Sequence, residues 1–474
     1  MKNNTLIDIY LKYSSKKDIK NFQRLVNAEY LNKPSNASSL IDNYYKYLVR
    51  HSKHPDILHI KKKVFGESNK SSQQFYDTCH QLLKLFKKFA IHSELESSPI
   101  HSQLNLLQYL RKKGMSDDFI KELDKINKSV DKSDLKDQEY HFNKYQIADN
   151  YNQFYLDQRT KRIDLSLQEK SDFLDSFYFS SKLKDCCEMI SRENIQKVVF
   201  RKPHLDRILE IVETDESLLN TPSIQVYYLI IQLFLKNMDK LYESAFQYTL
   251  ENRHLFPNEE QINILSYLYN YCIAQINQGN EDYLRKAHEA DILFLDSKLL
   301  FNKNQFSQWK FKNICTIALR LKEYKWTESF INQFSQYLPI NEQETAIAYN
   351  NAALNYELGN YKSALKTLNI TEFKEITYIL GAKSIQLKIY HEQNDTEALS
   401  YLVNSFSSFM KRNKQLSDNQ KLTYLNFIQL TDKINQLKNS KNSKNKATTL
   451  KAEIIQTSPV ANNTWLISQV NELI

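Results

Sequence analysis

The histidines of this sequence are the first residues to consider for chemistry. His51, His54 and His59 lie close together in the run HSKHPDILH. Their spacing matches neither the HExxH motif of zinc proteases nor a zinc-finger pair. We therefore interpret them as solvated or packed side chains beside a turn at Pro55, and we expect no metal site.

Four adjacent pairs resemble acid–base or nucleophile–base couples. They are Cys79-His80, His391-Glu392, Asp117-Asp118 and Glu259-Glu260. Neighbouring residues on a helix point about 100° apart, so neither His-containing pair is placed to share an activating hydrogen bond. The acidic pairs are typical of helix starts, where the helix dipole favours carboxylates. We expect no catalytic residue, no cofactor and no enzymatic activity.

The composition predicts that helices position all of these residues. The chain has 474 residues but only 5 glycines and 8 prolines, and it is rich in Leu, Lys, Glu and Gln. Scarce glycine argues against Rossmann, P-loop and most β-rich folds, and the abundant residues favour helix. The sequence therefore predicts an all-α protein.

The cysteines and the apolar runs favour a cytoplasmic protein. The five cysteines are scattered without a CxxC pair, which is typical of buried, reduced thiols. The first residues contain no uninterrupted apolar stretch, so we expect no signal peptide. The longest apolar run, Val226 to Leu235, is interrupted by Gln232 and is too short to span a membrane. We expect no membrane association.

The charge pattern bears on nucleic-acid binding. The net charge of +9 comes from 64 basic and 55 acidic residues that are interspersed. Lys61–Lys63 and the lysines at 84, 87 and 88 form separate basic groups, whereas phosphate binding needs cations that converge on one surface. A solvated surface is the preferred interpretation, and nucleic-acid binding by a helical-repeat protein is the alternative.

Small residues recur along the second half of the chain. Ala245, Ala287, Ser329, Ala364 and Ala398 are separated by 42, 42, 35 and 34 residues. Periods of this size indicate helical hairpins that stack on one another. The expected helix pairs are 137–160 with 167–190, 223–237 with 239–254, 259–278 with 281–296, 306–322 with 325–338, 342–358 with 361–370, and 374–392 with 395–413.

The run AYNNAALNYELGNYKSALKTL carries the clearest repeat pattern. We expect Ala352 at a close crossing of two helices, a turn at Gly359-Asn360-Tyr361, and Ala364 facing back from the second helix. Over residues 306–413 the sequence resembles tetratricopeptide repeats. The resemblance implies an α-solenoid whose first helices line a concave groove. An unrelated helical bundle with the same spacing is the alternative.

The N-terminal part shows a second resemblance. Lys17-Asp18-Ile19, Phe22, Asn32 and Val64-Phe65-Gly66 match positions in an uncharacterised family of bacterial cytoplasmic all-helical proteins, although the proline of that family's turn is missing. The resemblance implies the order of the domains and no chemistry.

We expect four segments along the chain. Residues 1–130 form an N-terminal helical domain, and residues 131–435 form the tetratricopeptide-like solenoid. Residues 436–449, rich in Lys, Asn and Ser, are predicted to be a flexible linker. Residues 450–474 form a C-terminal docking segment.

The concave groove is the expected binding site. Amides, aromatic rings and a cation can hold an extended peptide, so we expect a scaffold or adaptor that binds a protein or peptide of unknown identity. The expected groove residues are Tyr349, Asn350, Tyr356, Lys383, Ser384 and His391. For Tyr356 a place in the repeat core is the alternative. Only Asn350 matches the clamp with which some tetratricopeptide modules hold a C-terminal carboxylate, so we do not expect that clamp.

The C-terminal segment is expected to dock within the same molecule. It ends in a short helix, and so short a helix is marginal in isolation. The expected anchor residues are Trp465, Leu466 and Val470. Two arrangements remain open: the segment caps the open end of the solenoid, or it occupies the groove as a built-in ligand.

Overall fold

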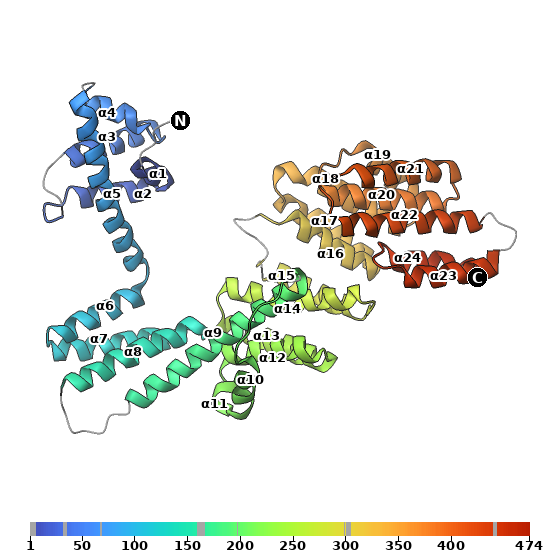
Figure 1. Ribbon diagram of the computed structural model, residues 1–474. Helices are drawn as coiled ribbons and strands as arrows, with labels where there is room; N and C mark the ends of the chain where they lie inside the picture. Colours follow the sequence, from blue (N-terminus) through green and yellow to red (C-terminus); the bar gives the residue numbers. More distant parts are fainter. Residues whose placement is uncertain are drawn as a thin grey trace. The chain divides into compact units, whose positions relative to one another are not determined.

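The protein is described by a computed structural model. It describes residues 6–31, 36–66, 69–158, 166–196, 198–297, 299, 305–438 and 443–474. Within these ranges the chain forms 24 α-helices and two short 3₁₀ helices and no strand, which confirms the all-α prediction (Figure 1). The chain divides into two compact units. The N-terminal unit comprises Met1–Lys182 and Glu213–Ile224, and the C-terminal unit comprises Leu183–Val212 and Gln225–Ile474.

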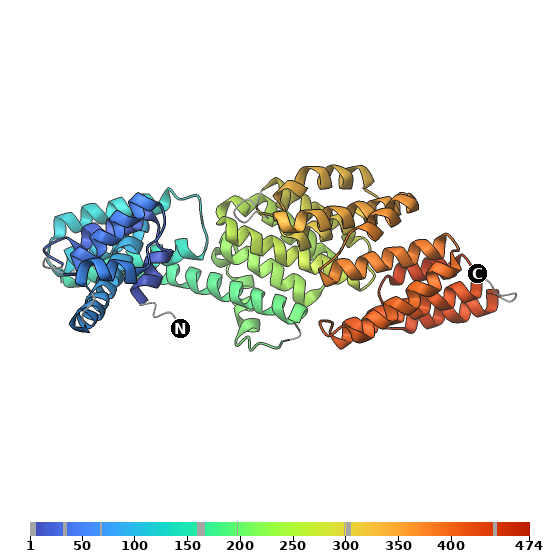
Figure 2. The ribbon, with the colours of Figure 1, turned by 90° about the horizontal axis from the view of Figure 1, so that it is seen from above.

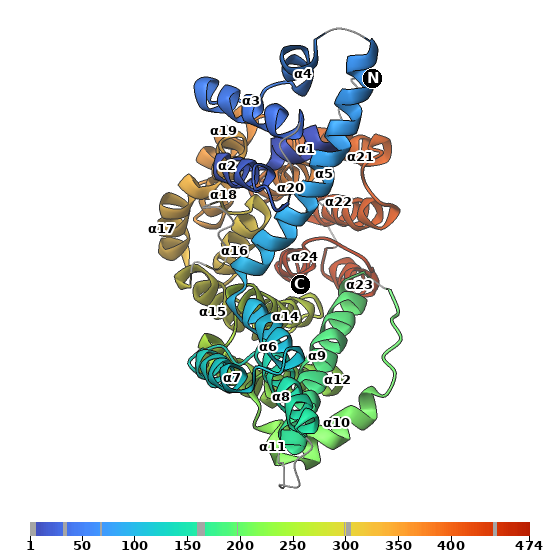
Figure 3. The ribbon, with the colours of Figure 1, turned by 90° about the vertical axis from the view of Figure 1, so that its left-hand side faces the viewer.

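The N-terminal unit has two cores. Its helices are α1 (Leu6–Tyr13), α2 (Lys16–Val26), α3 (Asn36–His51), α4 (Ile57–Phe65), α5 (Asn69–Ser97), α6 (Pro99–Lys112), α7 (Ser116–Asp131), α8 (Gln138–Asp157) and α11 (Glu216–Leu219). The long helix α5 packs against α1–α4, which lie beside it in Figure 3. Phe22 and Phe75 belong to the core of these five helices, and α6–α8 pack around Phe119. A capping box between Ser15 and Asp18 begins α2. Asn32, which carries part of the family resemblance, lies outside the described residues.

Three helices run from the residues of one unit into those of the other. They are α9 (Ser166–Gln196), α10 (Leu205–Thr214) and α12 (Pro222–Lys236).

The C-terminal unit continues as a series of helix pairs. Its helices are α13 (Asp239–Asn252), α14 (Asn258–Asn277), α15 (Tyr283–Asp296), α16 (Gln308–Arg320), α17 (Tyr324–Phe334), α18 (Ile340–Glu357), α19 (Tyr361–Ile370), α20 (Ile376–Glu392), α21 (Thr396–Arg412), α22 (Asp418–Lys438), α23 (Ser443–Gln456) and α24 (Asn463–Asn471). The 3₁₀ helices are Arg253–Leu255 and Ser335–Tyr337. These bounds confirm the predicted helices, except that α9 continues to Gln196. Figure 2 shows α12–α15, in green to yellow, lying side by side.

Close approach between helices depends on small residues. Helices α14, α18 and α20 each pack on the next helix in the chain, and α18 also packs on α16 and α20. Ala352 is fully buried, as its predicted position at a helix crossing requires. At Gly381 on α20, a Cβ atom would lie only 2.5 Å from the Tyr349 hydroxyl oxygen on α18. Glycine is therefore needed there for the two helices to approach.

The series of small residues is only partly confirmed. Ala245, Ala287 and Ala364 are buried against neighbouring helices. Ser329 is exposed, so its predicted role is wrong; Thr327, two residues earlier, is the small buried residue of α17. Two positions along a helix correspond to about 200°, which moves a side chain from the packed face to solvent.

The predicted flexible linker is largely helical in the described residues. Helix α22 continues to Lys438 and α23 begins at Ser443, while residues 439–442 lie outside the described residues. Ala447, Leu450 and Ile454 are buried on one face of α23. Since tertiary packing supplies most of a helix's stability, this apolar face outweighs the polar composition of residues 443–449.

Candidate functional sites in the C-terminal unit

The reactive-looking histidines of the N-terminal unit pack against tyrosines. His54 Nδ1 lies 3.2 Å from the Tyr44 hydroxyl, and the rings of His51 and His59 both contact Tyr47. In the part of the chain that the structure describes, no group of three His, Cys, Asp or Glu side chains could hold a metal ion. Over the same residues, no helix has the length and apolarity that crossing a membrane requires.

The residues predicted to line a peptide groove are mostly buried. Asn350 is 1% exposed and donates from Nδ2 to the Ala346 carbonyl, 2.8 Å away within its own helix. Ser384 is 5% exposed and donates from Oγ to the Leu380 carbonyl, also at 2.8 Å. Both side chains therefore donate hydrogen bonds to backbone carbonyls of their own helix and do not present an open hydrogen-bonding surface to a ligand.

Tyr349 and Lys383 also contact neighbouring helices. The Tyr349 ring packs 5.0 Å from the Tyr378 ring, and Lys312 Nζ lies 4.9 Å from its centroid. Half-buried Lys383 places Nζ near the ring of Phe406, and burial lowers the pKa of its ammonium group. These contacts place the predicted groove residues inside helix–helix interfaces.

Tyr356 belongs to a cluster centred on the Glu392 carboxylate. The hydroxyl groups of Tyr356 and Tyr361 donate to its two oxygens at 2.6 Å each. The indole N–H of Trp465, from α24, donates to Oε1 at 2.7 Å. Helices α18, α19, α20 and α24 thus meet at one acidic side chain, and charge-assisted hydrogen bonds of this kind are the stronger ones.

Burial shifts the pKa of several groups around this carboxylate. Desolvation lowers the pKa of Lys388 to about 8 and raises the pKa of Glu357. Lys388 Nζ lies 5.5 Å from the Tyr356 ring and 5.7 Å from the Trp465 ring, in the range of cation–π contacts. Burial lowers the pKa of His391, which is 1% exposed, to about 4.

The three expected tail anchors all contact the body of this unit. Leu466 and Val470 are fully buried in a core shared with α20–α23. The Trp465 ring packs 5.5 Å from His391 and 6.0 Å from Phe427 on α22. Two further contacts precede α24: Asn426 Nδ2 donates to the Pro459 carbonyl, and the Ala461 amide donates to the Thr423 carbonyl.

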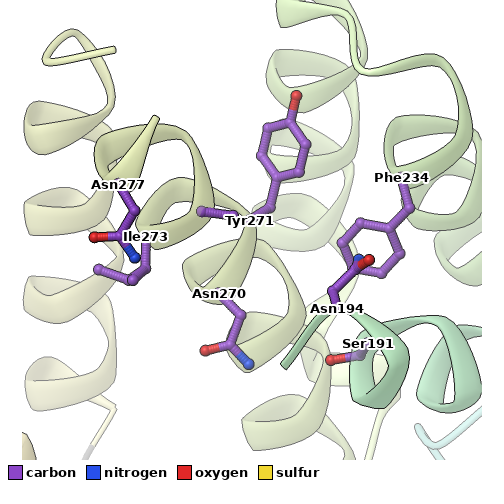
Figure 4. Close-up of a pocket in the computed structure, with 8 residues that line it drawn as sticks. Ser191, Asn194, Phe234, Asn270, Tyr271, Ile273 and Asn277 are labelled. Carbon is purple, nitrogen blue, oxygen red and sulfur yellow. The ribbon is translucent and has the colours of Figure 1, made fainter. Parts of the chain in front are cut away.

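A second candidate site lies between α9, α12 and α14 of the same unit. It is a pocket of about 380 Å³ lined by Ser191, Asn194, Phe234, Asn270, Tyr271, Ile273, Ala274 and Asn277. Figure 4 shows Ser191, Asn194 and Phe234 on one side of this space and Asn270, Ile273 and Asn277 on the other. We call it the carboxamide pocket.

The lining of the carboxamide pocket suits recognition of a neutral group. The carboxamides of Asn194, Asn270 and Asn277 make no hydrogen bond to another described residue. The Tyr271 hydroxyl is engaged, because it donates to Asn237 Oδ1 at 2.6 Å, and burial raises its pKa. The eight lining residues include no carboxylate, imidazole, thiol or amine. They offer donors and acceptors but no general base.

Sequence reasoning did not find the carboxamide pocket. Asn194 and Asn270 are far apart in the chain, and only the fold brings α9 beside α14. One signal was present: Asn270 and Asn277 are seven residues apart on a predicted helix, so they lie on one face.

Comparisons with known proteins place the chain in no family. No family model matches it, and no solved structure matches it. It is similar to Reticulocyte-binding protein homolog 1 from Plasmodium falciparum (isolate 3D7), with 23% identity over 365 residues. The match covers 69% of this chain and 12% of that protein, so the chain spans a small part of the length of the relative that it matches.

Proposed function

We propose that the C-terminal unit is a tetratricopeptide-like solenoid and that the protein is a non-enzymatic scaffold binding a segment of another protein. The observation that carries the proposal is the carboxamide pocket, where three asparagine side chains that hydrogen-bond to no other described residue line one space together with Phe234 and Ile273. This pocket takes the place of the expected groove, because five of the six side chains predicted to line that groove are buried.

The chemistry of the pocket favours an extended, uncharged stretch of polypeptide. A carboxamide donates and accepts at once, so it can pair with both the N–H and the C=O of a peptide backbone. Asn270 and Asn277 are separated by about 10 Å of helix rise, which is close to the length of three extended residues. Phe234 and Ile273 would contact an apolar side chain of the same segment.

The repeat pattern supports the solenoid part of the proposal. Helix α18 packs on α17 and α19, its neighbours in the sequence, and also on α16 and α20, the first helices of the adjacent hairpins. Contacts of both kinds are expected when hairpins stack in one direction. A cytoplasmic location and membership of the bacterial helical family belong to the same proposal. The five buried free cysteines support the cytoplasmic location. Lys17-Asp18-Ile19, Phe22, Asn32 and Val64-Phe65-Gly66 support the membership of that family.

Photo-crosslinking in the native cell tests the binding site. The full chain carries a benzoylphenylalanine in place of Ala274, which lines the pocket and is exposed. We expect a crosslinked protein whose yield falls at least fivefold when Asn270 and Asn277 are both replaced by alanine. The matched control places the same crosslinker at Ser244, an exposed residue of α13 outside the pocket.

Two results would contradict the proposal. One is a crosslinked product that is the same at Ala274 and Ser244, or that does not depend on the asparagines. The other is a crosslink to nucleic acid, together with reversible binding of that nucleic acid to the purified chain that weakens as salt rises. That salt dependence is the mark of phosphate binding and would favour the helical-repeat nucleic-acid alternative.

A further inference from the structure

The contact between α24 and the rest of the C-terminal unit resembles a ligand in a receptor site. On the ligand side, Trp465 contributes a hydrogen-bond donor, and Leu466 and Val470 contribute buried apolar side chains. On the receptor side, Glu392 contributes the acceptor, and Phe427 and His391 contribute ring surfaces. We call the receptor side the indole site.

The indole site is organised independently of α24. The Tyr356 and Tyr361 hydroxyls orient both oxygens of Glu392, and both tyrosines belong to a different hairpin from α24. When the indole leaves, the carboxylate keeps two of its three hydrogen bonds. The acceptor therefore stays in position for another indole N–H, and such preorganisation lowers the cost of binding.

Helix α24 has the properties of an exchangeable ligand. It contains only nine residues, and its N-cap residue Asn462 makes no side-chain capping hydrogen bond. A helix of this length gains its stability from docking, so its residues are helical only while they are docked. Its sequence NTWLISQVN contains no charged residue, so docking of α24 removes no charged side chain of its own from water.

We propose that the indole site is a second interaction site of this protein and that it binds an uncharged amphipathic helix of a partner, led by tryptophan with apolar residues one and five positions later. Helix α24 is its built-in occupant and competes with the partner helix. This inference rests on contacts separate from the carboxamide pocket, so its test does not depend on the function proposed for that pocket.

The test uses the full chain and a labelled peptide of residues 460–474, VANNTWLISQVNELI, followed by fluorescence anisotropy. In the wild-type chain the site is occupied by α24, so we expect weak binding of the peptide. In the Trp465→Ala chain the built-in ligand loses its anchor, and we expect the peptide to bind at least tenfold more tightly.

Two matched controls assign the effect to the indole hydrogen bond. A peptide with Trp465→Phe keeps an aromatic ring but loses the donor, and we expect about tenfold weaker binding. Adding Glu392→Gln to the Trp465→Ala chain changes the acceptor and is expected to weaken the unmodified peptide by a similar factor.

Failure of the peptide to bind the Trp465→Ala chain, or equal binding with and without Glu392→Gln, overturns the proposal. Because the variant chain could unfold, hydrogen exchange in the wild-type chain gives a second test. We expect the amides of α24 to exchange at least tenfold faster than those of α20, through local release. Equal protection of α24 and α20 would show that α24 is a fixed part of the core.

Discussion

Replacing Gly381 with alanine tests how closely α18 and α20 pack. The added Cβ would lie 2.5 Å from the Tyr349 hydroxyl oxygen, 2.6 Å from its Cε2 and 2.8 Å from its Cζ. Tyr349 is 8% exposed, and its ring packs against Tyr378 and Phe373. The ring therefore cannot move aside without disturbing other buried rings.

Two opposing effects set the size of the change. Overpacking of a core costs about 1–3 kcal/mol. Alanine in place of glycine within a helix returns about 1 kcal/mol through its higher helix propensity. Because the hydroxyl oxygen and two ring carbons of the buried Tyr349 are too close to the new methyl group, the overpacking dominates. We expect Gly381→Ala to lower the free energy of unfolding of this unit by up to about 2 kcal/mol.

The assay is a double-mutant cycle with Tyr349→Leu, measured by urea unfolding and by hydrogen exchange of the α18 and α20 amides. In the Tyr349→Leu background the clash is absent, so Gly381→Ala should stabilise the chain by about 1 kcal/mol. If Gly381→Ala has the same effect in both backgrounds, or stabilises the wild-type chain, the reasoning from the close approach is refuted.

Three further perturbations test the electrostatics and the caps. Asp291 on α15 is fully buried, and its carboxylate lies 2.6 Å from Lys310 Nζ on α16. Asp291→Leu alone leaves the lysine without its buried partner and should lower the free energy of unfolding by about 3–5 kcal/mol in urea. Asp291→Leu combined with Lys310→Met removes both charges and should lower it by about 1 kcal/mol or less. Burial lowers the pKa of His391 from its ordinary 6.5 to about 4, so the unfolded chain takes up a proton at a higher pH than the folded chain does. The free energy of unfolding should therefore fall as the pH drops from about 6.5 to 4. His391→Gln should reduce this fall by up to about 3 kcal/mol in a curve of stability against pH. Ser15→Ala removes the capping box of α2 and should lower the local stability of that helix by about 1 kcal/mol, seen as faster hydrogen exchange confined to the N-terminal unit.

The predicted groove residues show which structural properties a repeat pattern predicts and which it does not. Placing Tyr349 and Asn350 on the first helix of a hairpin was right, because helix bounds follow from periodicity. Placing them in an open groove was wrong for the described structure, since the same residues face neighbouring helices. Whether a first-helix residue faces ligand or core depends on the rotation of that helix, and rotation is set by packing partners from elsewhere in the chain.

The sequence by itself determined the all-α class and the helix bounds, because scarce glycine, helix propensity and apolar periodicity are local properties. It also indicated that the C-terminal helix needs a surface, because nine residues cannot form a stable helix alone. Only the tertiary structure decided that Trp465 meets Glu392, and that Asn194 shares a pocket with Asn270. These are contacts across more than seventy residues, and the chain specifies them through the combined packing of many helices rather than through any short pattern.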